Sequence, residues 1–369
     1  MKAIIFPGKY YQGEGIIGKV GEFIASYSAK KPMIIWGKRA KASTCDAVLS
    51  GLAAQGLEYA EFLFETDCTK AAAELISSKV KENNCDIVVG IGGGKALDIA
   101  KAVAIACGTK VIIAPTIASN DAPTSACTVW YDENHVYAGS DLWPTNPDIV
   151  LVDTAVMVKA PVRMLKAGIG DALATNIEAM AFSRTNRKTC AGGTPTAAVK
   201  ALAQLCFDML IENSEDAILA AEAGVVTPAF DKVVEANVLL SGIGWESGGI
   251  STAHELGNGL PDFEETHAYM HGDKVAFGIA TQLMLDPGTT SKEREDIVSF
   301  MAKIGLPVCF EDLNMQDTSR ERLYEWCQRH TRPGRIAHNH AFEVTADTLY
   351  QAMIAADAYG KKIKKLYAK

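Results

Sequence analysis

The chain has 369 residues, of which 48% are hydrophobic and 22% charged, so it is long enough for two globular domains with sizeable cores. Its net charge of −8 argues against nucleic acid as the main partner, because phosphate binding needs a basic face. Nine cysteines without a CxxC pair and an N-terminus without an export signal predict a cytoplasmic protein. No run of about 18 apolar residues predicts a membrane span.

Residues 1–160 alternate short β-rich runs with helix-like stretches, which predicts a parallel, Rossmann-like sheet covered by helices. The runs are almost continuously apolar, as expected for strands buried on both faces. They lie at 2–6, 32–36, 58–64, 86–90, 111–114 and 146–156.

A glycine-rich turn follows the fourth of these runs, where Gly92, Gly93 and Gly94 precede the helical stretch KALDIAKAVAIAC. Glycine permits positive φ and close approach of a ligand, and the N–H groups at a helix start attract phosphate. The spacing is neither G-x-G-x-x-G nor a P-loop. A tight turn without a ligand is the alternative, but three consecutive glycines exceed what a turn needs and favour phosphate.

A polar loop at 114–131 follows the next predicted strand and contains no lysine or arginine. Polar loops at strand ends often contact a pyrophosphate or ribose, which is the functional interpretation. The alternative is a loop ordered by its own Asx and Ser/Thr turns. Its candidate contacts are Thr116, Ser119, Asn120, Thr124 and Ser125.

Residues 161–369 are predicted to be all-helical, because apolar side chains recur there at intervals of three and four. The expected architecture is therefore an α/β domain over 1–160 and a helical domain over 161–369, with a cleft between them. A catalytic divalent ion usually has about three protein ligands and one open position. In the second half His254 and His271 each lie among glycines and small residues, and Asp171 follows a Gly-Ile-Gly at the expected start of a helix.

Other interpretations of these residues stay open. A helix cap would also explain Asp171, and a hydrogen-bonded core histidine would explain His254. His267 lies four residues before His271, so these two histidines form a rival pair on one helix. A further site is conceivable at the loop-like segment AHNHAF, residues 337–342.

The chain resembles the iron-containing alcohol dehydrogenase family, and most closely its zinc-type glycerol dehydrogenases. The matching stretches include GIGGGKALDIAKAVA, APTIASNDAPTSA, KAGIGDALAT, VVEANVLLSGIGWESGG and HAYMHGDKVAFG, and they follow one another along nearly the whole chain. The resemblance implies the metal ligands Asp171, His254 and His271, and Asp121 as the residue that holds a substrate hydroxyl. It implies cofactor contacts at Gly37, Gly93, Gly94, Lys95, Thr116, Ser119, Ser125, Cys127 and Tyr131.

Two departures from the family pattern bear on the metal and the cofactor. The iron enzymes of the family often have the patterns D-x-x-x-H and H-x-x-x-H and four ligands, but here Thr175 and Asn258 stand in place of the partner histidines. Three ligands with an open site are expected, which fits zinc better than iron. Lys38 and Arg39 follow Gly37, where an acidic residue often selects NAD. NAD is expected, and NADP is not excluded. At Cys127 the family more usually has leucine, another apolar residue.

The resemblance predicts oxidation of glycerol or a related vicinal diol to a ketone such as dihydroxyacetone, with hydride transfer to the nicotinamide. The proton is expected to leave through water or a histidine such as His267. A relative acting on a phosphorylated substrate, a glycerol-phosphate dehydrogenase or a dehydroquinate synthase-like lyase, is the alternative, but only Lys274 and Arg163 are basic near the predicted ligands. A non-enzymatic binding module is a third hypothesis. Relatives form large homo-oligomers, which implies a homo-oligomer here, up to an octamer.

Overall fold

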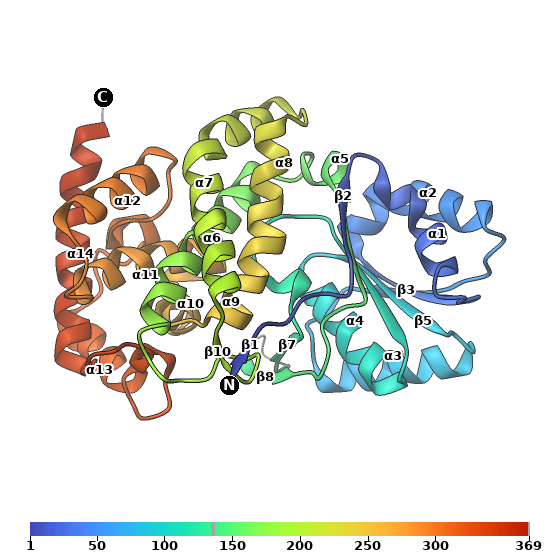
Figure 1. Cartoon of the computed structure of the whole chain (residues 1–369), viewed down its shortest axis with the longest axis horizontal. Coiled ribbons are helices and arrows are strands. Elements are labelled where there is room, and N and C mark those ends of the chain that lie inside the picture. The colour runs from blue at the N-terminus through green and yellow to red at the C-terminus, as the bar shows by residue number, and fades with distance from the viewer. Residues whose placement is uncertain (134–136, 368–369) are drawn as a thin grey trace. The chain divides into compact units, whose positions relative to one another are not determined.

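The computed structural model describes residues 1–133 and 137–367, and the chain forms two compact units (Figure 1). An α/β unit contains Ile5–Pro161 together with Ala220–Gly242, and a helical unit contains Met1–Ile4, Val162–Leu219 and the chain from Ile243 onward. The change of unit at Pro161 lies beside the predicted boundary. Two continuous domains were predicted, however, and the structure differs because residues 220–242 pack with the α/β unit.

A six-stranded parallel sheet forms the centre of the α/β unit. Its inner strands are runs of branched apolar residues that are buried along nearly their whole length, which is typical of a sheet covered on both faces. The order across the sheet is β2 (Tyr10–Gly13), β9 (Ile149–Asp153), β6 (Lys110–Pro115), β5 (Ile87–Gly92), β3 (Pro32–Gly37) and β4 (Ala60–Phe64).

Successive side chains of each strand point to opposite faces and therefore enter two separate cores. Ile34 and Trp36 of β3 pack with the helices α1 (Val20–Ala25) and α2 (Lys38–Ala54). Met33 and Ile35 pack with α3 (Lys70–Glu82) and α4 (Gly94–Cys107) on the other face. The predicted parallel sheet with helices on both faces is confirmed.

Neighbouring strands β3 and β5 are the point at which the chain changes direction across the sheet. Helix α2 leads from β3 to β4, toward one edge of the sheet. Helix α4 leads from β5 to β6, toward the opposite edge. In open parallel sheets, ligands bind in the crevice at the carboxyl ends of such a pair of strands. Here the two strands end at Gly37 and Gly92.

Three strand predictions were incomplete. The run at 2–6 contributes only β1 (Lys2–Ala3), which pairs with β10 (Thr194–Pro195) in the helical unit. Strand β2 was missed, since the four-residue edge strand YYQG lacks an apolar run. The expected loop at 114–131 ends in β7 (Cys127–Tyr131), which pairs with β8 (Tyr137–Leu142) in an antiparallel ladder.

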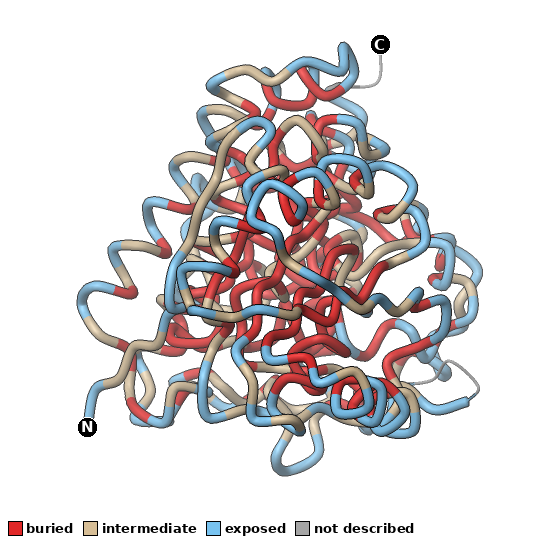
Figure 2. Tube along the Cα trace, turned by 90° about the vertical axis from the view of Figure 1, so that its right-hand side faces the viewer, coloured by how far each residue is buried: buried red, intermediate tan, exposed pale blue. Residues whose placement is uncertain are grey.

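The helical unit confirms the predicted helical second half. Figure 2 colours the trace of the whole chain by burial, and the buried stretches lie mainly toward the interior. No described helix is both long enough and apolar enough to cross a membrane. The main helices of this unit are α6 (Val162–Phe182), α7 (Ala197–Ala223) up to Leu219, α9 (Ser241–Gly248) from Ile243, α10 (Thr252–Gly259), α11 (His271–Leu285), α12 (Ser291–Lys303), α13 (Arg320–His330) and α14 (Ala346–Tyr367).

Candidate functional site

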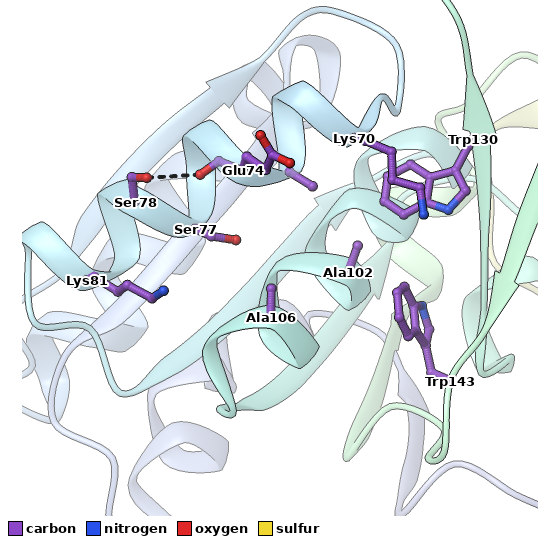
Figure 3. Close-up of a pocket in the computed structure, with 10 residues that line it drawn as sticks. Lys70, Glu74, Ser77, Ser78, Lys81, Ala102, Ala106, Trp130 and Trp143 are labelled. Carbon is purple, nitrogen blue, oxygen red and sulfur yellow. Dashed lines mark hydrogen bonds between the residues drawn. The ribbon is translucent and has the colours of Figure 1, made fainter. Parts of the chain in front are cut away.

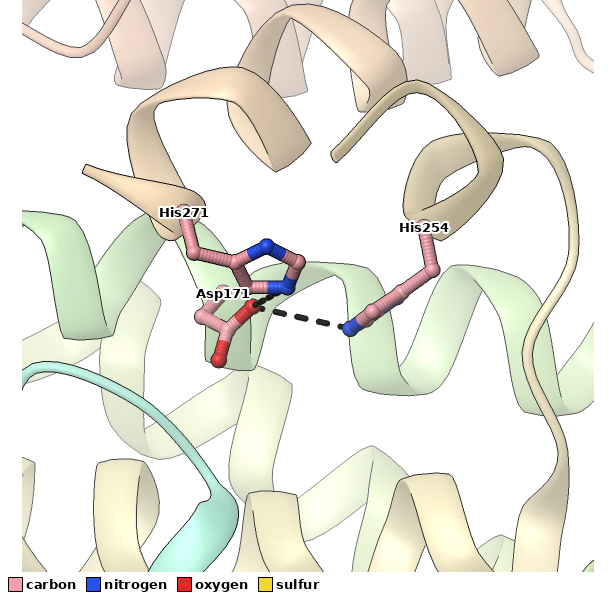
Figure 4. Close-up of side chains that lie close together, drawn as sticks. All are labelled: Asp171, His254 and His271. Atoms are coloured by element: carbon pink, nitrogen blue, oxygen red, sulfur yellow. Dashed lines mark ion pairs between the residues drawn. The ribbon is translucent and has the colours of Figure 1, made fainter. Parts of the chain in front are cut away.

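Three side chains from three helices converge in the helical unit (Figure 4). Asp171 comes from α6, His254 from α10 and His271 from the first position of α11. Asp171 Oδ1 lies 3.5 Å from Nε2 of His254 and 3.4 Å from Nε2 of His271. One ligand atom from each of the three residues lies within 4.8 Å of the others. The structure therefore brings together the predicted triad.

Asp171 is fully buried, while the His271 side chain is 34% exposed, so the group has one accessible side. Asp171 was expected at the start of a helix, where it could have been a cap. It lies instead in the interior of α6, which begins at Val162, so the capping alternative is wrong.

Glycines at the helix crossings bring the three residues together. Gly170 on α6 precedes Asp171, and Gly272 on α11 follows His271. A Cβ at Gly272 would overlap the carbonyl oxygen of Ala167, so α6 and α11 touch backbone to backbone beside two of the ligands.

Helix α10 approaches α11 in the same way. A Cβ at Gly278 of α11 would overlap the carbonyl oxygen of Ala253, the residue before His254. The ligands can therefore meet because no side chain separates their helices at these points.

The imidazole of His254 is held from behind by Glu178, a fully buried residue of α6. Nδ1 of His254 lies in short hydrogen-bonding contact with Oε2 of Glu178. The other nitrogen, Nε2, consequently faces Asp171. A carboxylate behind a histidine in this way is common at protein metal sites.

Electrostatics separate the two histidines in the metal-free protein. Burial lowers the pKa of His254, but the carboxylates of Glu178 and Asp171 outweigh it and raise that pKa well above its ordinary value. For His271 burial dominates over the attraction of Asp171, and the pKa falls below its ordinary value. A cation that binds Nε2 of His254 therefore competes with a proton at that site.

The other histidines have different contacts. Nε2 of His267 lies 2.9 Å from the carbonyl oxygen of Pro261, and that of His338 lies 2.9 Å from the carbonyl oxygen of Thr331. His340 contacts a helix-start hydroxyl instead. Within residues 1–133 and 137–367, the group of side chains spaced to hold a metal contains none of these three.

The two positions that supply further ligands in the four-ligand enzymes do not do so here. The methyl group of Thr175 packs against Gly244, where a Cβ would overlap it, and Asn258 is exposed. The donors that remain are one carboxylate oxygen and two imidazole nitrogens. This set fits a divalent ion of borderline softness with an open coordination position.

In the α/β unit, the predicted cofactor residues gather near the carboxyl ends of β3, β5 and β6. Gly37 ends β3, Gly93 and Gly94 form the turn from β5 into α4, and Thr116 follows β6. Helix α4 begins at Gly94 without a side-chain cap, and the uncapped start of a helix attracts a phosphate.

Of the two predicted reasons for the glycines, positive φ is wrong, whereas close approach of a ligand stays a prediction. Gly92, Gly93 and Gly94 are absent from the described glycines that have positive φ. A Cβ at Gly92 would lie 2.9 Å from the Cβ of Ala96, and one at Gly90 would overlap Ala100. These two glycines let α4 pack closely on β5, while Gly93 and Gly94 remain at the turn.

Lys95 and Tyr131 lie together beside this turn. Nζ of Lys95 lies 4.6 Å from the ring centroid of Tyr131 and forms an ion pair with the buried carboxylate of Asp67. Burial, helped by Asp98 and Asp67, raises the pKa of Tyr131 to about 12, so the phenol stays neutral. Lys95 is therefore placed at the predicted edge but is already paired.

A buried ion pair on α4, which was not predicted from the sequence, holds the polar loop. Asp98 Oδ1 lies 2.8 Å from Nζ of Lys101, and both side chains are almost completely buried. Lys101 donates to the carbonyl oxygen of Ala122 at 3.0 Å and lies 3.4 Å from the hydroxyl of Ser125. Asp98 accepts from the backbone N–H of Val129 at 3.0 Å. The available signal was two opposite charges, three residues apart, inside an apolar helix.

The same loop is held from a second side by residues from the second half of the sequence. The Asn237 side chain donates to the carbonyl oxygen of Ala118 at 3.1 Å, and the Thr124 hydroxyl donates to that of Val238 at 3.3 Å. Asn237 and Val238 belong to a π-helical turn, Ala236–Leu240, that follows α8 (Pro228–Glu235). The loop carries the predicted residues Ser119, Asp121, Ser125 and Cys127, and its conformation is fixed by both sets of contacts.

Lys38 and Arg39, the residues that bear on the choice of cofactor, are exposed. Nζ of Lys38 lies 2.9 Å from a carboxylate oxygen of Glu65, just beyond the end of β4. The carboxylate of Glu65 therefore lies near the carboxyl end of β3, even though the residue that follows Gly37 is a lysine.

A separate hollow of about 400 Å³ lies beside α3 and α4, with Trp130 and Trp143 in its wall (Figure 3). None of its lining residues is a predicted cofactor or metal residue. The hollow is therefore distinct from the glycine turn.

Comparison with known proteins agrees with this geometry. The family model described as iron-containing alcohol dehydrogenase matches residues 7–154. A glycerol dehydrogenase of Pseudomonas putida is 39% identical over 360 residues, covering 98% of each chain. One from Escherichia coli O6:H1 is 40% identical over 356 residues, covering 96% of each. The crystal structure of glycerol dehydrogenase from Schizosaccharomyces pombe superimposes with a TM-score of 0.95 at 31% identity, covering all of this chain and 93% of that one. The chain therefore belongs to the iron-containing alcohol dehydrogenase family, in its glycerol dehydrogenase branch, and is an oxidoreductase.

Proposed function

We propose that this enzyme oxidises glycerol, or a closely related vicinal diol, to a ketone such as dihydroxyacetone, with hydride transfer to NAD. The observation that carries the proposal is the convergence of Asp171, His254 and His271 in a chain of this family. The substrate carbon loses a hydride to the nicotinamide, and its hydroxyl loses a proton to water.

The chain's own residues have distinct parts in this reaction. Asp171, His254 and His271 would hold one divalent ion per subunit and, with three donors, leave one position open. A bound ion supplies a Lewis acid that stabilises negative charge developing on a substrate oxygen. Asp121 would orient the neighbouring hydroxyl, as the resemblance implies.

Zinc is the proposed metal. One carboxylate and two imidazoles are a ligand set that catalytic zinc uses, and the side chain at Thr175 presents a methyl group to Gly244 and carries no imidazole. The four-ligand iron relatives use one donor more than these three, and neither Thr175 nor Asn258 is a histidine that could supply it.

NAD is proposed over NADP because the Lys38 ammonium is paired with Glu65. A 2′-phosphate at this corner would face that carboxylate, whose charge repels it. The turn at Gly93 and Gly94 would admit the pyrophosphate, and the start of α4 would attract it.

The alternative of a phosphorylated substrate receives no support from Lys274, the basic residue three positions after His271. Lys274 is buried and donates to the carbonyl oxygen of Tyr269 at 2.6 Å, and burial lowers its pKa. Its ammonium is therefore already used within the fold.

The test combines metal analysis of the purified protein with a substrate panel. Glycerol, 1,2-propanediol and glycerol phosphate are each assayed with NAD and NADP by the absorbance of the reduced nicotinamide. We expect about one zinc per chain and turnover of an unphosphorylated polyol with NAD. Preference for glycerol phosphate, or full turnover by metal-free protein, would overturn the proposal.

We also infer that the enzyme is cytoplasmic, because its nine cysteines are scattered and form no CxxC pair. The resemblance implies in addition that it is a homo-oligomer. Light scattering coupled to size-exclusion chromatography measures its mass directly, and a mass near the 39.5 kDa of one chain would contradict this.

A further inference from the structure

We propose that Glu178 is a positioning residue of the metal centre: it fixes His254 in the tautomer whose Nε2 faces the ion, and it caps the helix that carries His254. The inference rests on the proposed metal function. Glu178 is not itself among the three converging side chains and acts only through His254.

The two oxygens of Glu178 have separate contacts. Oε2 meets Nδ1 of His254. Oε1 accepts the backbone N–H of Ser251 at 2.8 Å and that of His254 at 2.9 Å. The side chain is fully buried, so these contacts replace the water that a carboxylate otherwise needs.

The contact at Oε2 determines which nitrogen of His254 can bind a metal. A carboxylate only accepts hydrogen bonds, so Nδ1 must carry the hydrogen. In the neutral ring the lone pair is then on Nε2, the atom 3.5 Å from Asp171 Oδ1. Glu178 thus favours the tautomer in which His254 can act as a ligand at that position.

The contacts at Oε1 hold the start of α10. Ser251, the residue before α10, makes no side-chain cap, although the first N–H groups of a helix need acceptors. Glu178 accepts the N–H of His254, and Oε1 of Gln282 accepts that of Ala253 at 3.0 Å. Two side chains from other helices therefore replace the missing cap.

Those two helices are the same ones that supply the other ligands. Glu178 follows Asp171 on α6 by seven residues, which places it on the same face about 10 Å further along. Gln282 follows His271 on α11 by eleven residues, again on nearly the same face. Each helix thus contributes one predicted ligand and one side chain that caps α10, so the position of His254 is set without the metal.

The test is the metal affinity of Glu178→Gln, measured with Co²⁺ and Zn²⁺ by competition with a chromophoric chelator, without substrate or cofactor. The amide oxygen can still cap α10, but the amide N–H groups would face Nδ1 and favour the opposite tautomer. We expect affinity about 10- to 100-fold weaker than in the wild type, and an altered visible spectrum of the Co²⁺ protein.

Glu255→Gln is the matched control. Glu255 is an equally buried carboxylate on α10, but it contacts His330 and Arg335 instead of His254. The same chemical change there should leave the Co²⁺ affinity within about twofold, even if the thermal stability falls. Equal losses in both variants, or no loss in Glu178→Gln, would overturn the inference.

Glu178→Asp keeps the charge while shortening the side chain, and it covers the case in which Glu178→Gln does not fold. We expect it to bind Co²⁺ more tightly than Glu178→Gln and several-fold more weakly than the wild type. Wild-type affinity in Glu178→Asp, or tighter binding by Glu178→Gln, would contradict a role through the hydrogen on Nδ1. A wild-type protein that binds no divalent ion would instead refute the proposed function itself.

Discussion

Single residues of one type have different parts in this fold because their neighbours differ. His254 is enclosed by carboxylates on two sides, from Glu178 and Asp171, whereas His271 is partly exposed and faces Asp171. His267, only four residues before His271, is exposed and makes a contact with a backbone carbonyl. These differences yield predictions that are specific to each histidine.

His271→Gln should lose the metal, while His267→Gln should keep it. The first change removes one of three donors, but the second alters a surface contact. We expect metal analysis after dialysis to show no bound metal in His271→Gln, with kcat/KM lower by about a thousandfold or more. If His267→Gln also lost its metal, the rival pair of histidines would regain support.

His340 should make the metal-free protein less stable in mild acid. Burial lowers the pKa of His340 to about 4, against the attraction of Asp286 and Glu178. The unfolded chain, with an ordinary histidine pKa near 6.5, therefore binds more protons between about pH 6.5 and 4. The free energy of unfolding is therefore unaffected by this residue above that window, and it decreases by up to roughly 3 kcal/mol as the pH falls through the window.

The measurement is the melting temperature between pH 7 and pH 4.5 in the presence of a chelator. His340→Gln removes the titrating group and can still hydrogen-bond to the Thr252 hydroxyl, which lies 2.8 Å from His340 in the wild type. Its melting temperature should fall less with acid than that of the wild type. His338→Gln, two residues away, is the control, and its melting temperature should fall with acid nearly as much as that of the wild type, because the charge of His338 makes only the smallest contribution to the lowered pKa of His340. Parallel acid profiles for the wild type and His340→Gln would contradict the prediction.

At the scale of helices, the distance between the ligands depends on how closely the axes cross. Gly170 and Gly272 let α6 and α11 touch, and Gly278 does the same for α10 and α11. Each crossing lies next to a ligand in sequence, so a side chain at the crossing would separate the ligands themselves. Stability and metal affinity should therefore change together at these positions.

Gly272→Ala should weaken metal binding without changing any ligand. Its Cβ would overlap the carbonyl oxygen of Ala167, and because backbone cannot rotate away, the helices must separate. Overpacking of this kind costs about 1–3 kcal/mol of stability, and we expect weaker Co²⁺ binding together with a lower melting temperature. Gly13→Ala is the control, since a Cβ there has nothing within 4 Å. Unchanged Co²⁺ affinity in Gly272→Ala would show that the crossing does not set the ligand distances.

At the scale of the whole molecule, the chain crosses between its units more often than the sequence suggested. Residues 220–242 return to the α/β unit, where Asn237 and Val238 hold the polar loop. Their helical pattern resembles that of their neighbours in sequence, and nothing local marks the unit with which they pack.

The fold features that could be predicted from the sequence are local, whereas those that were missed depend on contacts between residues far apart in the chain. Strands such as β5 were predictable because burial on both faces requires an apolar run, whereas the polar edge strand β2 was not. The triad came from a resemblance and from unusual glycine settings. Glu178 and Gln282 were missed because their partners lie far away in sequence, on α10.

Removal of the metal should abolish catalysis but leave cofactor binding intact. The three predicted ligands all belong to the helical unit, whereas every predicted cofactor residue belongs to the α/β unit. Each set is held by contacts within its own unit, such as Glu178 with His254 in one and Lys101 with Ala122 in the other. We therefore expect the dissociation constant of NADH, measured by fluorescence, to change by less than about threefold after chelation, a coupling below the usual range.

Zinc added back to the chelated protein should restore turnover in proportion to the metal bound, while the NADH affinity stays constant throughout the titration. The coupling can be checked from both sides, because a metal that strengthened NADH binding would itself be bound more tightly in the presence of NADH. Loss of NADH binding on chelation would mean that the metal supports residues of the α/β unit. The assignment of cofactor and metal to separate units would then be wrong, even if the triad were correct.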